Sequence, residues 1–331
     1  MNKGLHWFSL LVAGATFFLI IAGALVTSND AGLATEDWPL SNGQFFPEMV
    51  GNLFWEHGHR MVATTVGLLT IVLVLLLYRW ALRRVLWRVL NLTLGVQVPK
   101  VKPGEPPLWL RRLGMLALFG VIVQGLLGGL TVKLMLPLAV STAHATLAQL
   151  FFCTTVALAV FTSKSWSQYD LTLDEKGTLP VRYVCATAAA TILLQLVLGA
   201  TLRHSATWDK HLPTELLLAH IGGAILVAVT LASASFMILR RHPGVRFLTT
   251  PATIAVALLG LQLLLGIAAY LTRLGSPNDP QPLHPMIGIT VAHVACGALV
   301  FATTIVLTLR TFKVLRAGEP EFALATSPQR V

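Results

Sequence analysis

Four histidines occupy matching places in this chain of 331 residues. Each lies shortly after the start of the second helix in a predicted hydrophobic hairpin; they are His59, His144, His220 and His293. An imidazole inside a bilayer is energetically costly, so an intramembrane histidine is a functional hypothesis by default. Two histidines that face each other across a helical bundle can supply both axial ligands of a haem iron. The four positions therefore predict two six-coordinate haem sites.

Composition predicts the elements that must position these histidines. The chain is 55% hydrophobic and 11% charged, with a mean hydropathy of +0.73, whereas soluble domains carry about 25% charged residues. Apolar runs of about 20 residues can cross a bilayer as helices. We therefore predict an all-α membrane protein with eight transmembrane helices, near 7–27, 52–78, 112–132, 137–161, 183–203, 214–239, 251–272 and 286–309.

The net charge of +10 is explained by membrane topology rather than by nucleic-acid binding. Of the 24 Lys and Arg residues, five lie on one side of the predicted membrane: Arg60, Lys133, Arg203, Lys210 and Arg273. The others lie at the termini and in the loops of the opposite side, which the positive-inside rule places in the cytoplasm. We therefore expect a multi-pass protein of the cytoplasmic membrane with both termini inside, in contact with lipid and with no nucleic acid.

The spacing of the histidines indicates a tandem duplication. Each histidine of the first half has a counterpart four spans later, on a helix of the same orientation. Two four-helix bundles, residues 1–165 and 166–331, are therefore expected, related by a pseudo-twofold axis along the membrane normal. Each half would hold one histidine pair. One half could be an active site and the other an electron relay.

A second pattern lies on the helices that precede the histidines. A glutamine is followed four residues later by a glycine in three of them, at Gln124/Gly128, Gln195/Gly199 and Gln262/Gly266. The first helix keeps the glycine but has no glutamine. Residues at i and i+4 share a helix face, and glycine lets a neighbouring helix or a flat ligand come close. Helix packing alone could also explain this pattern.

The segment Glu56 to Arg60 is the densest cluster of chemical groups. Glu56 and His59 share a helix face, whereas His57 points away from it. Glu56 lies nearer the outer surface, where a carboxylate could donate or accept a proton beside a haem edge. The alternative is a carboxylate at a helix N-terminus, which the helix dipole favours.

Other outer groups could serve these sites. A long loop at 28–51 could cover a site at the outer surface. Basic residues at the outer helix ends could pair with haem propionates. Alternatively, they could only extend their charged groups to the membrane–water interface. These residues are Arg60, Lys133, Arg203 and Arg273. Residues 79–111 are expected to be a cytoplasmic linker, and three further histidines are expected in outer loops: His204, His211 and His284.

Together these residues resemble the haem A synthase family, which converts haem O to haem A for haem-copper oxidases. The resemblance rests on Glu56-x-x-His59-Arg60 and on Asp-Trp-Pro-Leu-Ser-Asn-Gly-Gln at 37–44. The other histidine helices fit as well, at 141–149, 216–224 and 291–298. The resemblance extends over all eight predicted spans.

The resemblance implies a role for each residue. His59 and His144 would face the substrate haem, with Glu56 important for oxidation of its C8 methyl group to formyl. His220 and His293 would ligate a haem b cofactor. Our candidates for further haem contacts are the basic residues Arg203 and Arg273.

Some expectations remain open. Many bacterial members carry a cysteine pair where this chain has Thr35 and Ser41, so no disulfide is expected in this loop. The histidine pattern alone also allows a non-catalytic diheme cytochrome b, or a haem carrier or assembly factor. Candidate partners are haem O synthase, oxidase assembly proteins and a second copy of the chain, and the electron donor is left open.

Overall fold

The computed structural model describes residues 3–94, 105–175, 179–209, 213–275 and 283–317. Eight of its helices are long and apolar enough to cross a membrane. They are α1 (Lys3–Ser28), α2 (Asn52–Leu94), α3 (Leu108–Lys133), α4 (Leu138–Phe161), α6 (Val181–Asp209), α7 (Thr214–Arg241), α8 (Arg246–Leu274) and α9 (His284–Val314). The predicted all-α membrane fold with eight spans is therefore confirmed.

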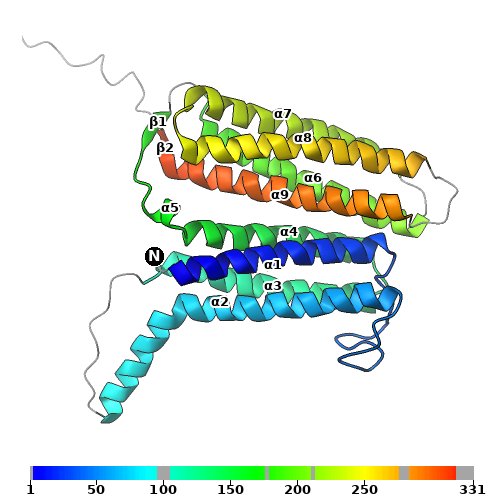
Figure 1. The fold of residues 1–331 in the computed structure, drawn as a ribbon, viewed down its shortest axis with the longest axis horizontal. Coiled ribbons are helices and arrows are strands. Elements are labelled where there is room, and N and C mark those ends of the chain that lie inside the picture. Colours follow the sequence, from blue (N-terminus) through cyan, green and yellow to red (C-terminus); the bar gives the residue numbers. More distant parts are fainter. Residues whose placement is uncertain (1–2, 95–104, 176–178, 210–212, 276–282, 318–331) are drawn as a thin grey trace, which may run out of the picture.

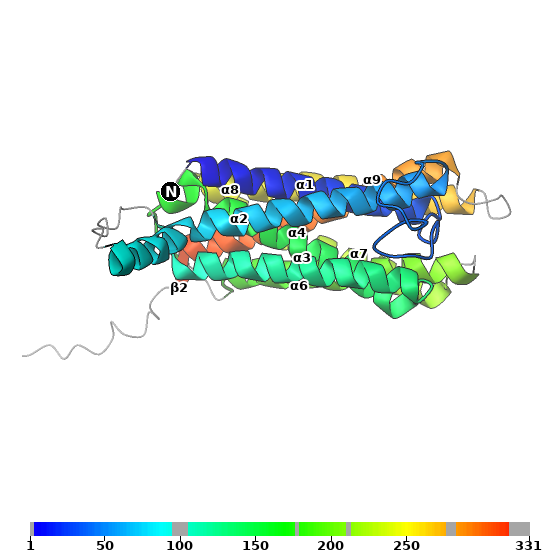
Figure 2. The same ribbon diagram turned by 90° about the horizontal axis from the view of Figure 1, so that it is seen from below.

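The eight helices form two bundles that lie side by side (Figures 1 and 2). In the first bundle α1 to α4 pack in cyclic order, and in the second α6 to α9 do the same. Between the bundles, α1 packs on α9, α4 on α6, and α4 on α9. Exchanging the bundles helix for helix leaves these contacts unchanged, which agrees with the predicted pseudo-twofold relation.

Proline lies immediately before several of these helices and so marks where each connection ends. Pro107, Pro137 and Pro213 are the residues immediately before α3, α4 and α7, each with an extended backbone. Proline has a fixed φ near −65° and no amide hydrogen to leave unpaired at a helix start. Consecutive long helices run antiparallel, and α2, α4, α7 and α9 all begin at the same end of the molecule (Figure 1).

Two helices, α2 and α6, continue into segments that were predicted to be a linker and an outer loop. The linker expected at 79–111 is partly wrong, because α2 continues to Leu94 and turns away from the bundle (Figure 1). Residues 79–94 contain no proline or glycine, so nothing in them ends the helix. Helix α6 reaches Asp209, so the outer-loop position expected for His204 is also wrong. His284 begins α9, whereas Lys210 and His211 lie outside the described residues.

A short helix and a strand pair complete the end opposite the long loop. Helix α5 (Lys164–Ser167) follows α4, and β1 (Leu173–Glu175) pairs in parallel with β2 (Leu315–Ala317). The expected all-α fold did not include these strands. They join the segment between the bundles to the end of α9, a long-range pairing that local patterns do not reveal.

The interiors of the bundles are closely packed and largely apolar. One buried cluster includes Phe152, Ala188, Leu231 and Ala298 and crosses the boundary between the bundles. The three cysteines are free thiols within buried surroundings. Cys153, Cys185 and Cys296 pack as small side chains between helices.

Candidate active site and histidine pairs

All four histidines lie near the end of the bundles at which residues 29–51 are placed, which we call the loop end (Figure 1). His59 and His144 come from α2 and α4, and His220 and His293 from α7 and α9. Within each bundle these helices are diagonal to each other in the cyclic order. The fold therefore brings together the residues of each predicted pair at one level of one bundle.

Each histidine ring packs against the glycine of the preceding helix. A methyl group on Gly23 would lie 3.1 Å from Cε1 of His59. The same close approach recurs for His144 at Gly128 (3.1 Å), His220 at Gly199 (2.9 Å) and His293 at Gly266 (3.1 Å). These glycines therefore make room for an imidazole, and the pattern seen in the sequence has a specific structural cause.

The glutamines complete this arrangement in three hairpins. Gln124 Nε2 donates to the backbone carbonyl of His144 at 2.9 Å, and Gln195 Nε2 donates to that of His220 at 2.8 Å. In the last hairpin, Gln262 Nε2 lies 3.3 Å from Nε2 of His293. A hydrogen-bonded amide beside an imidazole restricts the orientation of the ring. Each glutamine is thus a partner of its histidine.

The pair in the second bundle fits a shared haem iron. The ring centroids of His220 and His293 are 6.4 Å apart, with an angle of 70° between the ring planes. Two metal–nitrogen bonds of about 2 Å each place the centroids of two axial imidazoles roughly 6 Å apart. The separation is therefore the one that bis-histidine ligation requires.

We expect a substitution at Gly199 to disturb this pair. A valine there would displace the His220 ring, whereas a valine at Gly260 on α8, where a methyl group meets nothing within 4 Å, should be tolerated. Loss of the support around a metal-binding histidine lowers metal affinity by about 10–100-fold. Titration of the purified variants with haem b would test this, and equal affinities for Gly199→Val and Gly260→Val would contradict it.

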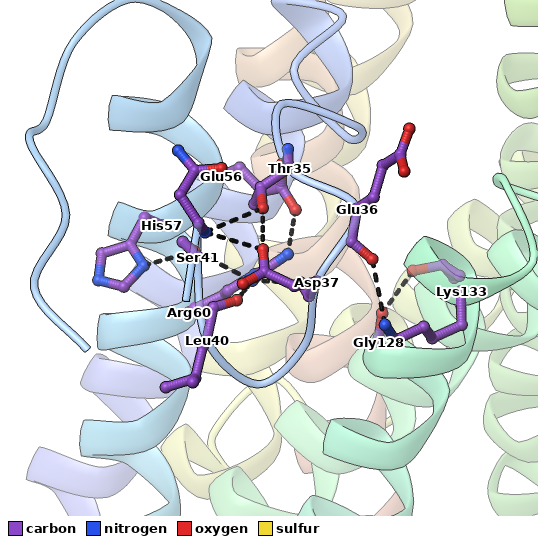
Figure 3. A network of polar contacts seen from close by, with 12 residues as sticks. Thr35, Glu36, Asp37, Leu40, Ser41, Glu56, His57, Arg60, Gly128 and Lys133 are labelled. Carbon is purple, nitrogen blue, oxygen red and sulfur yellow. Dashed lines mark hydrogen bonds and ion pairs between the residues drawn. The ribbon is translucent and has the colours of Figure 1, made fainter. Parts of the chain in front are cut away.

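The first bundle adds a buried ion pair on α2, the helix that carries His59 (Figure 3). Glu56 is only 4% exposed and pairs with Arg60, one turn along α2. The other carboxylate oxygen of Glu56 accepts a hydrogen bond of 3.1 Å from the backbone N–H of Thr35. Glu56 is therefore held between its own helix and the long loop, rather than exposed at a helix end.

Arg60 fixes the loop to α2. Its Nη1 donates to the carbonyl oxygens of Asp37 (3.0 Å) and Leu40 (2.6 Å) and to the hydroxyl of Ser41 (3.1 Å). This single guanidinium joins the buried carboxylate to three loop residues, a use for which its fan of donors is well suited. In this structure Arg60 therefore holds the loop against α2.

His57 is a site residue that sequence reasoning missed. It is 5% exposed, and its Nδ1 lies 2.9 Å from the hydroxyl of Ser41, within the same network (Figure 3). The sequence offered a signal, because Ser41 and Thr35 are polar loop residues able to form hydrogen bonds with the Glu56–Arg60 segment. Here both form hydrogen bonds with the network.

The loop also has its own internal support. The carboxylate of Asp37 accepts hydrogen bonds from the Thr35 hydroxyl and from the backbone N–H groups of Gly43 and Asn42. These bonds hold the pKa of Asp37 well below its usual range. A lowered pKa means that this support is present above the ordinary pKa of an aspartate and is lost only as the pH falls below it. The hydrogen bonds that Asp37 accepts are therefore present at neutral pH.

Loop residues also reach α3 and its following turn. Lys133 Nζ donates to the backbone carbonyl of Glu36 at 3.2 Å (Figure 3). The indole of Trp38 packs directly on Gly129, where any side chain would collide with it. The loop therefore bridges α2, which carries His59, and α3, which precedes the helix that carries His144.

We expect Arg60→Gln to loosen this cover. Breaking a buried ion pair leaves an uncompensated charge and costs about 3–5 kcal/mol, so the loop should detach more often. Chymotrypsin should then cleave beside the exposed Phe45 and Phe46 several-fold faster. Glu36→Gln is the matched control, because Lys133 binds the backbone of Glu36 and not its side chain; equal cleavage rates for the two variants would refute the role of Arg60.

The other predicted basic residues have different surroundings. Arg203 Nη2 donates to the hydroxyl of Ser28 at 2.7 Å and so links α6 of the second bundle to α1 of the first. Arg273 lies in the last turn of α8, at the loop end. Both are at the level expected for haem propionates, and their role as haem contacts stays a prediction.

Comparison with known proteins places these features in a family. A model of the family described as COX15-CtaA, cytochrome oxidase assembly protein, matches residues 48–208, which include the first histidine pair and Glu56. A protein named heme A synthase from Geobacillus kaustophilus is 25% identical over 94% of this chain and 93% of its own length. A namesake from Shouchella clausii is 26% identical over 82% of this chain and 88% of its own length. One from Caulobacter vibrioides is 40% identical over 22% of this chain and 24% of its own length. These matches confirm the predicted resemblance: the chain is similar to the COX15-CtaA family over residues 48–208 and to proteins named heme A synthase over most of its length.

Proposed function

We propose that this protein is a membrane-bound oxidoreductase that converts haem O to haem A near the outer face of the cytoplasmic membrane. Its product would supply haem-copper oxidases. The observation that carries this proposal is the asymmetry between the two histidine pairs. Only the first pair has the buried Glu56 beside it and the Arg60-bound loop above it. Leu217 stands in the second half where Glu56 stands in the first.

The two halves would then have different duties. In residues 1–165, His59 and His144 would hold the substrate haem O with its C8 methyl group near Glu56. In residues 166–331, His220 and His293 would hold haem b, and the 6.4 Å separation of their rings supports this assignment. When bound, haem b would supply one-electron transfer between an external donor and the substrate site.

Glu56 would transfer protons at the substrate site. The methyl group would become formyl by two successive hydroxylations and loss of water. With dioxygen as the oxidant, each hydroxylation takes up two electrons from the external donor and two protons and releases one water, and a buried carboxylate beside the substrate can relay these protons. Arg60 would keep the carboxylate in place, and its hydrogen bonds to the loop would exclude water from the site. Arg203 and Arg273 would pair with haem propionates at the loop end.

The proposed orientation places the loop end outside the cell. Basic residues are concentrated at the opposite end of the helices, as the positive-inside rule requires of the cytoplasmic side. Haem O would therefore be oxidised at the outer half of the bilayer. Haem O synthase and oxidase assembly proteins are the partners that this reaction implies.

Identification of the bound haems tests this function. The purified protein should yield haem b together with haem O, a hydroxylated intermediate or haem A on extraction and mass analysis. Two equivalents of haem b and no other haem would instead support an electron-carrying diheme cytochrome b, the alternative that the histidine pattern allows.

A further inference from the structure

His59 and His144, the two histidines proposed to hold the substrate haem, differ in the residues beside them. His144 has Gln124 beside it, just as His220 has Gln195 and His293 has Gln262. The corresponding position on α1, four residues before Gly23, is occupied by Leu19. Leu19 packs against the apolar core of the first bundle. His59 is thus the one histidine of the four whose preceding helix offers it a glycine but no amide.

The buried polar atoms show what the glutamines can do. An imidazole that binds a metal through Nε2 carries its hydrogen on Nδ1, and that hydrogen needs an acceptor in an apolar interior. Within the described residues, Oε1 of Gln124, Gln195 and Gln262 is buried and without a hydrogen-bond partner. Among the described residues, Nδ1 of His144 and Nδ1 of His293 are likewise buried and without a hydrogen-bond partner. In this structure the amide nitrogens of Gln124 and Gln262 lie 3.5 and 3.3 Å from Nε2 of their histidines, and that of Gln195 lies 3.0 Å from Nδ1 of His220. Rotation of the amide and the ring would bring the unpaired glutamine oxygen to the Nδ1 hydrogen when Nε2 binds a metal.

His59 has no comparable acceptor on α1. Its Nδ1 is also buried and without a partner in the part of the chain that the structure describes. An axial histidine whose Nδ1 hydrogen is not accepted is a weaker and less well oriented ligand, because hydrogen bonding at Nδ1 raises the basicity of Nε2. The two axial positions of the substrate haem are therefore predicted to differ in strength.

We propose that His59 is the exchangeable axial ligand of the substrate haem and that Gln124 makes His144 the permanent one. The inference rests on the proposed function and extends it. Glu56 and His59 share a face of α2, so the axial position that opens lies next to the buried carboxylate. Leu19 keeps this position available, and Gln124 is a positioning residue for the opposite one.

Removal of each histidine provides the first test. Purified His59→Ala and His144→Ala proteins are titrated with haem O, and absorption spectra report affinity and spin state. The His59 variant should retain haem O in a high-spin, five-coordinate state and bind carbon monoxide when reduced. The His144 variant should lose haem O affinity by at least about tenfold more. Equal losses of affinity in both variants would overturn the proposal.

Transfer of the glutamine provides the second test. Leu19→Gln gives His59 the partner that His144 has, so the affinity of the reduced substrate site for carbon monoxide should fall by about tenfold or more. Gln124→Leu should instead weaken haem O binding, whereas Gln195→Leu is the matched control that affects haem b alone. Unchanged carbon monoxide affinity in Leu19→Gln would count against the proposal.

These outcomes also separate the inference from the function on which it rests. If the unmodified protein does not bind haem O in the first bundle, the proposed function fails and the inference fails with it. If haem O binds but His59 and His144 hold it equally, the inference alone fails, and the synthase assignment stands on the extracted haems.

Discussion

Glu56→Gln is expected to lower haem A formation by about 10²–10⁴-fold, the usual contribution of a general acid or base. Glutamine has nearly the same shape as glutamate, and its one carbonyl oxygen can still accept from either Arg60 or the N–H of Thr35. Arg60 keeps its own hydrogen bonds to Asp37, Leu40 and Ser41, so the loop should stay closed. It cannot take up a proton. Haem O should therefore remain bound and accumulate, which chromatography of extracted haems would show.

The second half of the chain offers a control for this variant. Glu215 lies in the first turn of α7, the helix that carries His220, and is exposed. Glu215→Gln should leave haem A formation unchanged. If Glu56→Gln also makes haem A at the normal rate, the proton-transfer role of Glu56 is wrong, and the carboxylate serves only to hold Arg60 and the loop.

His220→Ala and His293→Ala are each expected to abolish the b-type absorption spectrum of the purified protein. Their rings are 6.4 Å apart and would share one iron. Removal of one ligand leaves a single axial bond, and the remaining ring loses its counterpart across the bundle. Haem A formation should stop in the same variants, because electrons could no longer pass through the second bundle.

His242→Ala is the matched control for this prediction. His242 follows α7 immediately, at the end opposite the loop end, and so belongs to the same half but not to the site. Its variant should keep the full b-type spectrum. A b-type spectrum that persists in both His220→Ala and His293→Ala would show that haem b is held elsewhere, for which the first histidine pair would be the next candidate.

Local sequence patterns were sufficient for the architecture. Spans of about 20 apolar residues specify transmembrane helices because every backbone polar group must be paired inside the bilayer. The four histidines and three glutamines recur at fixed offsets from helix ends, so their shared level could be predicted without coordinates. Helix ends were less predictable. Helices α2 and α6 continue beyond the apolar spans because no residue there terminates them.

The sequence by itself therefore determined the eight spans, the repeated histidine positions and the resemblance to haem A synthases. Only the tertiary structure decided what the polar residues touch. Arg60 was a candidate for haem propionates, yet it binds the loop, and His57 was set aside, yet it is buried against Ser41. Such contacts join residues that are far apart in the chain, and no local periodicity encodes them. The partner of a buried polar group is selected by packing and by the cost of leaving that group unpaired.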